Sequence, residues 1–278
     1  MKVYSPTSLQ EAYEILASTE AKILAGGTDL MVLWNSNVAK LPQVVVDIWR
    51  MKMLAQIDDE GEVLRIGARC TYTQIINNPL TKNFAPALVD AARTIGAVQI
   101  QNRGTIGGNV VNASPAGDSL PVLVAFDAKV EIGSLRGVRT VALEQFYTGY
   151  RKTVLAADEM VTAILLPKQR EDEVSKFYKI GTRAAQAISK VVMAARAVLQ
   201  GGLIAAVGIG VGSVAPTVIR AKATEGVMLG RQIDDELVTA ARRTMMNEVK
   251  PITDVRSTEF YRRTVSGNLV AKFLREIV

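Results

Sequence analysis

The stretch TIGGN at residues 105–109 does most to decide the fold of this chain, and the related stretch AGGTD lies at residues 25–29. Each holds two adjacent glycines beside a threonine, and an acidic residue follows each pair. Glycine tolerates positive φ and lets a ligand approach the backbone closely. Consecutive N–H groups in such a turn form a concave anion site. Two such loops predict a long ligand with two anionic groups, such as a dinucleotide pyrophosphate.

The alternative is that the two glycine pairs are unrelated tight turns, because Gly-Gly is a common turn signal. The first pair follows the apolar run 23–25 and precedes the apolar run 30–34, which predicts a strand, a turn and a helix. The second pair follows Asn-Arg-Gly at 102–104. Neither matches Gly-x-Gly-x-x-Gly or the Walker A pattern, so the sequence does not predict a Rossmann or P-loop site.

The two glycine motifs resemble those of the FAD-binding flavoprotein subunit of the molybdenum hydroxylases, the family of xanthine dehydrogenase and aerobic carbon monoxide dehydrogenase. The most specific element is the second loop, with Asn109 and the downstream Ala-Ser-Pro-x-x-Asp that ends at Asp118. The resemblance covers nearly the whole chain. It continues through segments 4–9, 66–71, 177–183, 254–258 and 261–263.

Composition indicates a folded protein with an aliphatic core. The 278 residues are 49% hydrophobic, 22% charged and 5% aromatic, with a formal net charge of +6. The 33 basic and 27 acidic residues are interspersed without a dense basic run, so we expect no nucleic-acid partner. We interpret the pairs Arg242-Arg243 and Arg262-Arg263 as solvated surface, with a docking face for an acidic partner subunit as the alternative.

The chain contains no histidine and one cysteine. The absence of histidine excludes a Ser-His-Asp triad, a Cys-His pair and any histidine-ligated metal site. The single cysteine excludes an intramolecular disulfide and a cysteine-ligated iron–sulfur cluster within this chain. Cys70 is interpreted as a small buried hydrophobe. Electrons would therefore move through an organic cofactor or through a partner, and we predict no metal site here.

The segment 197–219 is uncharged and long enough to span a bilayer. It also contains Gln200, Pro216 and five glycines, which predict two buried strands joined by a glycine turn. In the run 208–212, alternate glycines predict a strand that packs closely against a neighbour. The N-terminus has no long apolar core of a signal peptide. We expect a cytoplasmic protein without a membrane span.

Local patterns predict an α+β protein in three parts. In residues 1–55, Ser8 has the capping-box spacing that starts a helix to about residue 16, and strands are expected at 21–25 and 43–48. In residues 56–168, we expect strands at 62–67 and 160–166, a hairpin at 129–133 and 137–141, and helices starting at Thr71 and Pro86. The apolar segment 120–126 fits a helix or a strand.

A charged segment at 168–173 is expected to be an exposed connection to the third part, residues 174–278. There, strand signals run from 176 to 214, and helical patterns follow at 234–249 and 257–278. These predict an antiparallel sheet backed by helices. The family resemblance implies the p-cresol methylhydroxylase-type FAD-binding fold, with two α/β subdomains and a C-terminal antiparallel sheet with helices.

The resemblance also implies that FAD is bound non-covalently, in extended form, between the two N-terminal subdomains. Asp118 would accept a hydrogen bond from a ligand hydroxyl. Lys179 would contact the flavin, or else be a solvated strand lysine, and Val161 would contact FAD through main chain, or else be core. The implied FAD contacts are Lys22, Ile23, Leu24, Ala25, Gly26, Gly27, Thr28, Asp29, Ile95, Ala97, Thr105, Ile106, Gly107, Gly108, Asn109, Asp118, Val161 and Lys179. No catalytic residue is predicted.

The function implied is that of an electron-transfer subunit. Iron–sulfur clusters on a small partner would deliver electrons to FAD, substrate oxidation would occur at the molybdopterin cofactor of a large partner, and NAD or another acceptor would receive the electrons. The implied assembly is a dimer of heterotrimers. Animal xanthine dehydrogenases have acidic residues in the loop that corresponds to 181–186, which has none here, so the acceptor stays open.

Two other functions fit parts of the sequence. One is a stand-alone FAD-dependent oxidoreductase on the same fold, similar to a cell-wall reductase. It would need its own substrate groups near the flavin, and the sequence shows no convincing set. The other is a non-catalytic assembly or nucleic-acid-binding module, which would bind no flavin.

Overall fold

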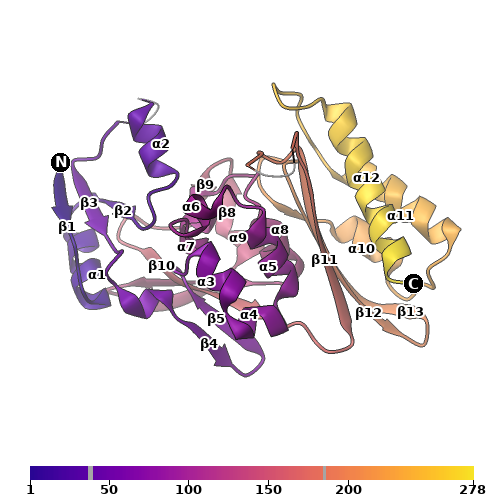
Figure 1. Cartoon of the computed structure of the whole chain (residues 1–278), viewed down its shortest axis with the longest axis horizontal. Coiled ribbons are helices and arrows are strands. Elements are labelled where there is room, and N and C mark those ends of the chain that lie inside the picture. Colours follow the sequence, from indigo (N-terminus) through magenta and orange to yellow (C-terminus); the bar gives the residue numbers. More distant parts are fainter. Residues whose placement is uncertain (37–39, 184–185) are drawn as a thin grey trace.

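The computed structural model describes residues 1–36, 40–183 and 186–278. The chain passes from an N-terminal sheet on one side of the molecule, through a helix-rich middle part, to a long-stranded sheet with helices on the other side (Figure 1). Each of these parts has its own cluster of buried apolar side chains. The boundaries at 55, 168 and 174 stay predictions.

The N-terminal part is built on a parallel sheet in the order β1-β3-β2. The Ser8 hydroxyl accepts a hydrogen bond from Glu11 N and starts the first helix, as the capping pattern predicts. The elements are β1 (Lys2–Tyr4), α1 (Leu9–Ser18), β2 (Lys22–Leu24), α2 (Leu30–Asn35), β3 (Val44–Asp47) and the 3-10 helix η1 (Lys52–Ala55). Glycines 26 and 27 lie between β2 and α2, which confirms the predicted strand, turn and helix.

The middle part contains an antiparallel sheet in the order β4-β5-β10-β6-β7. Its strands are β4 (Ile57–Glu60), β5 (Val63–Gly67), β6 (Lys129–Ser134), β7 (Gly137–Ala142) and β10 (Met160–Pro167), and β8 (Tyr147–Gly149) pairs with β9 (Lys152–Thr153). Thr71 and Gln74 form a full capping box at the start of the first helix here. The predicted hairpin and strands are confirmed.

Short helices cover this sheet (Figure 1). They are α3 (Tyr72–Asn77), α4 (Pro79–Phe84), α5 (Pro86–Arg93), α6 (Val98–Gln101), α7 (Ile106–Asn112), α8 (Leu120–Ala125) and α9 (Leu143–Phe146). The ambiguous segment 120–126 is thus a helix, and every residue of α8 is buried. Cys70 is fully buried, as predicted, and its thiol donates to Gln56 O at 3.2 Å.

The C-terminal part is an antiparallel sheet in the order β11-β12-β13-β14, with three helices placed beside it among the described residues. The elements are β11 (Glu173–Ile180), β12 (Val191–Gln200), β13 (Leu203–Gly212), β14 (Ile219–Arg220), α10 (Lys222–Met228), α11 (Asp235–Glu248) and α12 (Glu259–Glu276). The uncharged segment 197–219 therefore forms strands around a Gly201-Gly202 turn. Among the described residues, no helix is long and apolar enough to cross a membrane.

Alternate glycines on β13 let this sheet approach α8 directly. A Cβ at Gly210 would overlap Pro121 O, and one at Gly208 would overlap Ala125 O. The predicted close packing is confirmed, and the neighbour is helix backbone. Asp127, just after α8, then pairs with Arg196 at 2.8 Å and with Arg220 at 2.5 Å, which joins the middle part to the C-terminal sheet.

Two expectations for the third part are wrong. The connection 168–173 is not exposed throughout, because Glu173 starts β11 and its buried carboxylate pairs with Arg196 at 2.9 Å. The pair Arg262-Arg263 is not solvated either. Arg262 is 5% exposed, and it donates to Ser213 O at 2.6 Å and to Asp254 Oδ1 at 2.7 Å.

Candidate functional site

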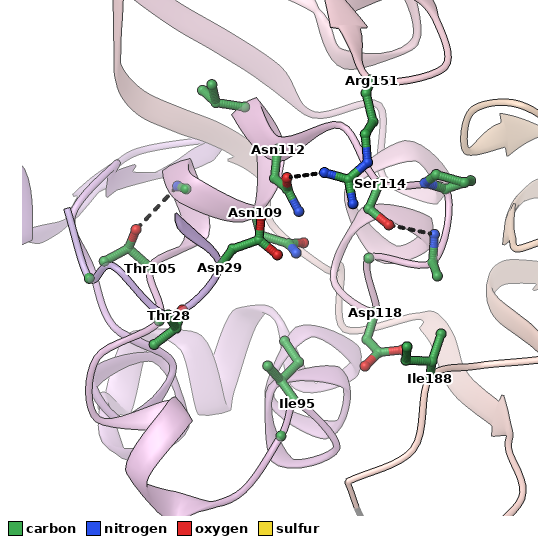
Figure 2. Close-up of a pocket in the computed structure, with 18 of the residues that line it drawn as sticks. Thr28, Asp29, Ile95, Thr105, Asn109, Asn112, Ser114, Asp118, Arg151 and Ile188 are labelled. Atoms are coloured by element: carbon green, nitrogen blue, oxygen red, sulfur yellow. Dashed lines mark hydrogen bonds between the residues drawn. The ribbon is translucent and has the colours of Figure 1, made fainter. Parts of the chain in front are cut away.

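A cleft of about 950 Å³ runs between the N-terminal part, the middle part and the C-terminal part. Both glycine pairs face it. Figure 2 shows Thr28 and Thr105 on one side of the cleft, Asn109 near its centre, and Asp118 with Ile188 on the other side. The predicted residues on its wall are Lys22, Ile23, Ala25, Gly26, Gly27, Thr28, Asp29, Ile95, Ala97, Thr105, Gly107, Gly108, Asn109, Asp118 and Val161.

The two glycines of the first pair have different structural roles. Gly27 has φ +76°, a left-handed conformation that glycine adopts without strain, and its carbonyl accepts from Met31 N to start α2. Gly26 allows close packing, because a Cβ there would overlap Arg103 O. The first loop thus lies directly against the segment that leads into the second loop. The sequence separated the two loops by about eighty residues, and the fold brings them together.

The second glycine pair is not a positive-φ turn, which corrects the sequence interpretation. Gly107 and Gly108 lie in the first turn of α7, and the Thr105 hydroxyl caps this turn by accepting from Gly108 N at 3.1 Å. Gly107 is buried, and a Cβ there would stand 2.6 Å from Ala68 O. Gly108 is exposed and borders the cleft. The N–H groups at the start of α7 already donate within the protein: Gly107 N donates to Ala68 O at 2.9 Å, and Ile106 N donates to Cys70 O at 3.0 Å.

Asn109 projects from α7 into the cleft and is held by a chain of hydroxyls. Ser119 Oγ donates to Asn109 Oδ1 at 2.8 Å, and Tyr72 OH lies 3.3 Å from the same Ser119 Oγ. Because Oδ1 accepts from Ser119, the Nδ2 group of Asn109 is the part left to donate to a ligand. Neither Ser119 nor Tyr72 was predicted, since their roles depend on contacts across 10 and 47 positions of sequence.

Asp118 forms a buried ion pair with Lys179. The Lys179 Nζ donates to Asp118 Oδ2 at 2.6 Å and to Thr94 O at 2.9 Å. Burial raises the pKa of Asp118 to about 6, although Lys179 acts in the opposite direction. The other carboxylate oxygen, Oδ1, is buried without a hydrogen-bond partner among the described residues. A buried acceptor of this kind is normally satisfied, so it indicates a donor on a bound ligand.

Three predicted contacts lie off the wall of the cleft: Leu24, Ile106 and Lys179. Leu24 lies in β2, Ile106 is fully buried in the middle core, and Lys179 reaches the site through Asp118. The alternative of a solvated lysine at 179 is wrong, because its side chain is 11% exposed and ion-paired. Val161 is 5% exposed and borders the cleft, so it packs in the core, and its main-chain contact with FAD stays a prediction.

The structure adds polar wall residues that were not among the predicted FAD contacts, although some of them lie in segments that carry the family resemblance. In Figure 2, Arg151 donates to Asn112 Oδ1 at 3.0 Å, and Ser114 Oγ accepts from Ala116 N at 3.3 Å. Further wall residues come from the C-terminal part, and they are Gln186, Ile188, Ser189, Ser213, Lys250, Asp254, Arg256 and Arg262. In the acceptor loop 181–186, residues 184 and 185 lie outside the described residues.

The comparisons with known proteins agree along the whole chain. Residues 1–169 match the family model described as the FAD binding domain in molybdopterin dehydrogenase. Residues 176–277 match the CO dehydrogenase flavoprotein C-terminal domain. The chain belongs to the FAD-binding subunits of the molybdopterin dehydrogenases. It is an oxidoreductase subunit with FAD as its cofactor, and the predicted p-cresol methylhydroxylase-type fold is confirmed.

Individual relatives have different substrates in their names. The chain is 33% identical over 274 residues to the xanthine dehydrogenase FAD-binding subunit of Escherichia coli O157:H7, covering 98% of this chain and 94% of that one. It is 32% identical over 273 residues to the glyceraldehyde dehydrogenase medium chain of Sulfolobus acidocaldarius, covering 97% and 95%. A carbon monoxide dehydrogenase structure from Hydrogenophaga pseudoflava superposes with a TM-score of 0.94, at 29% identity and 98% and 94% coverage.

The residues of the cleft fit FAD chemically. The first glycine loop offers backbone to a pyrophosphate, Gly108 lets a ligand approach α7 closely, and Asp118 Oδ1 offers an acceptor to a hydroxyl. The apolar wall beside Asp118 includes Ile95 and Ile188, which suit the faces of an aromatic ring. The cleft thus combines an anion-binding side and an apolar side, as a flavin dinucleotide requires.

Proposed function

We propose that this chain is the electron-transfer subunit of a molybdenum hydroxylase complex. It would receive electrons from iron–sulfur clusters on a partner subunit and deliver them to NAD or another acceptor. One observation carries the proposal: two flavoprotein family models account for residues 1–169 and 176–277, while the chain has a single cysteine and no histidine to bind a second redox centre. An electron donor must then belong to another chain.

When bound, FAD would supply the redox chemistry, and the protein would supply position and electrostatics. The first loop would hold the phosphates through backbone N–H groups, and Gly108, which has no side chain, would let them approach the start of α7 closely. Asn109 Nδ2 would donate to the ligand, in the orientation that Ser119 fixes. Asp118 Oδ1 would accept from a hydroxyl, and Lys179 would keep the Asp118 carboxylate charged and in place. Val161 and Ala97 would border the cofactor through main chain.

The assembly we propose contains an iron–sulfur subunit and a molybdopterin-binding subunit, as a dimer of heterotrimers in the cytoplasm. Relatives named as medium chains or FAD subunits match over nearly their full length, which supports a role as one subunit of several. The organic substrate would bind to the molybdopterin subunit, so this chain does not define it. The stand-alone flavoenzyme gains no support from the described residues of the cleft.

The proposal is tested by purifying the chain alone and in complex. The isolated chain should carry FAD, and it should not oxidise a purine, an aldehyde or carbon monoxide. Co-expression with its genomic neighbours should yield one species on size-exclusion chromatography that contains iron, molybdenum and FAD. Substrate turnover by the isolated chain would contradict the subunit assignment. So would a flavin-loaded monomer that never co-elutes with either partner.

A further inference from the structure

Trp49 lies between two arginines just behind the first glycine loop. The Arg103 guanidinium carbon is 3.7 Å from the centre of the indole ring, and that of Arg69 is 4.9 Å from it. The three residues come from different segments: Trp49 follows β3, Arg69 follows β5, and Arg103 follows α6. A cation over an aromatic face is attracted to it, but a second cation on the same ring repels the first.

These two guanidinium groups have no acidic partner. Among the described residues, neither Arg69 nor Arg103 forms a side-chain hydrogen bond or an ion pair, and Arg69 Nε is buried and unpartnered. Burial lowers the pKa of Arg69, and the charge on Arg103 lowers it further. Elsewhere in the described chain, partly buried arginines such as Arg65 and Arg220 are paired with carboxylates. Arg69 is half-buried without such a partner and Arg103 is exposed, so this pair of positive charges favours a carboxylate from another molecule.

Helix α2, which follows the first glycine loop, has an apolar surface that none of the described residues buries. Its sequence is Leu-Met-Val-Leu-Trp-Asn, yet none of its residues is buried, and none belongs to the apolar clusters of the described residues. Met31 is 46% exposed and Val32 is 64% exposed. Figure 1 shows α2 standing apart from the helices of the middle part. An exposed apolar helix of this kind marks an interaction site.

The first glycine loop connects the two features. Gly26 lies against Arg103 O, and Gly27 O accepts from Met31 N at 2.9 Å in α2. The cluster is also next to the flavin cleft. The residues that precede or follow its members in the chain, Ile48, Ala68 and Gly104, line that cleft. A protein docked on α2 and the arginine cluster would lie close to the bound flavin.

We propose that Trp49, Arg69, Arg103 and the exposed side of α2 form the surface on which the iron–sulfur subunit docks, through an acidic face with an apolar centre. This inference rests on the proposed function. Charge complementarity favours this occupant, since two neighbouring guanidinium groups without an acidic partner among the described residues suit an acidic face. A second copy of this chain is disfavoured, because a two-fold contact would bring this cationic cluster against itself. An electron donor must also lie near the bound FAD, and neighbours of this cluster in the chain line the FAD cleft.

The test measures the affinity of the FAD-loaded chain for the iron–sulfur subunit encoded beside it, purified with its clusters. Arg103→Glu should weaken binding about tenfold or more, because it places a carboxylate where the partner's would lie. It should keep its FAD, since the Arg103 side chain does not line the cleft. Val32→Asp tests the apolar part independently and should weaken binding similarly. Lys222→Glu, an equal charge change at a 67% exposed lysine paired with Glu144, serves as control.

Salt provides a second readout. Binding of the wild-type chain should weaken as ionic strength rises, and Arg103→Glu should show a shallower dependence, because one exposed charge pair is lost. If Arg103→Glu and Val32→Asp both bind like wild type while Lys222→Glu also does, the docking surface is wrong but the proposed function stands. If the wild-type FAD-loaded chain does not bind the subunit at all, the proposed function itself fails.

Discussion

Lys179 Nζ lies 2.6 Å from Asp118 Oδ2 across the boundary between the C-terminal sheet and the middle part. Lys179 lies in β11, and Asp118 lies two residues before α8. Both side chains are about nine-tenths buried, at 11% and 10% exposed. The pair therefore fixes the position of the Asp118 carboxylate, which borders the cleft and whose second oxygen has no partner among the described residues. It also ties the C-terminal sheet to the flavin-binding part of the chain.

Replacing Lys179 should destabilise the protein and reveal its energetic coupling to Asp118. Lys179→Met leaves a buried carboxylate without its cation, which costs about 3 kcal/mol at neutral pH. Lys179 lowers the pKa of Asp118, so the variant should bind a proton at Asp118 at higher pH, and the loss should shrink at low pH. Urea unfolding of the apo protein measures this. The double variant Asp118→Asn/Lys179→Met should recover part of the lost free energy of unfolding. If the effects of the two single substitutions on that free energy simply add, the two residues are not coupled.

The affinity for FAD should rise with pH through about 6, the pKa of Asp118 in the free protein. A ligand hydroxyl that donates to the Asp118 carboxylate stabilises its charged form, so FAD binding lowers the pKa of Asp118. FAD therefore binds more tightly at a pH above this pKa than at a pH below it. A hydrogen bond to a charged acceptor is worth about tenfold in affinity. Fluorescence titration with FAD at several pH values measures the profile. Asp118→Asn should flatten it, and an unchanged profile in that variant would show that Asp118 does not contact the ligand.

The two glycines of the second motif should respond differently to the same substitution. Gly108→Val should reduce FAD content strongly, because residue 108 is exposed and borders the cleft. It should cost little stability, because its Cβ would meet only the Thr105 hydroxyl, a side-chain atom, at 2.8 Å. Gly107→Val should destabilise the protein by about 2 kcal/mol or more, because its side chain would meet the Ala68 backbone. Thermal unfolding and flavin content per chain separate the effects. Equal behaviour of the two variants would contradict this assignment.

FAD should be released completely by acid precipitation. The chain has no histidine. The thiol of Cys70 is fully buried, and burial raises its pKa to about 12, so it is neither accessible nor ionised. Tyr72 borders the cleft, but burial also raises the pKa of its phenol. Flavin fluorescence in the supernatant and in the pellet measures how much FAD is released and how much is retained. Yellow colour retained on the denatured chain would show a covalent bond.

Local signals predicted most of the elements because they act within a few residues. The caps at Ser8 and Thr71 and the glycine turn at 201–202 are examples. Helix α10 was missed, since no side chain caps its start and Gly226 lies inside it. The second glycine motif was interpreted as a turn because Gly-Gly disfavours a helix. Its helical form depends on the tight packing of Gly107 against Ala68, which is a tertiary contact.

The sequence motifs pointed to the site, but they did not predict the hydrogen bonds and ion pairs between its residues. Asp118 and Lys179 are 61 positions apart, so neither periodicity nor spacing could pair them. The same holds for Tyr72 and Ser119, which orient Asn109. The buried state of Arg262 was missed for a different reason. An Arg-Arg pair on a helix is usually solvated, but here one of the two turns inward to Asp254 and Ser213.

Electron transfer between purified subunits tests the central claim most directly. The FAD-loaded chain is mixed without oxygen with the reduced iron–sulfur subunit encoded beside it, and the flavin absorbance is followed. The account predicts that the flavin is bleached on mixing, and that Gly108→Val, which should lack FAD, shows no such signal. A flavin absorbance that stays unchanged in a complex shown to have formed would contradict the assignment of this chain as the electron-transfer subunit.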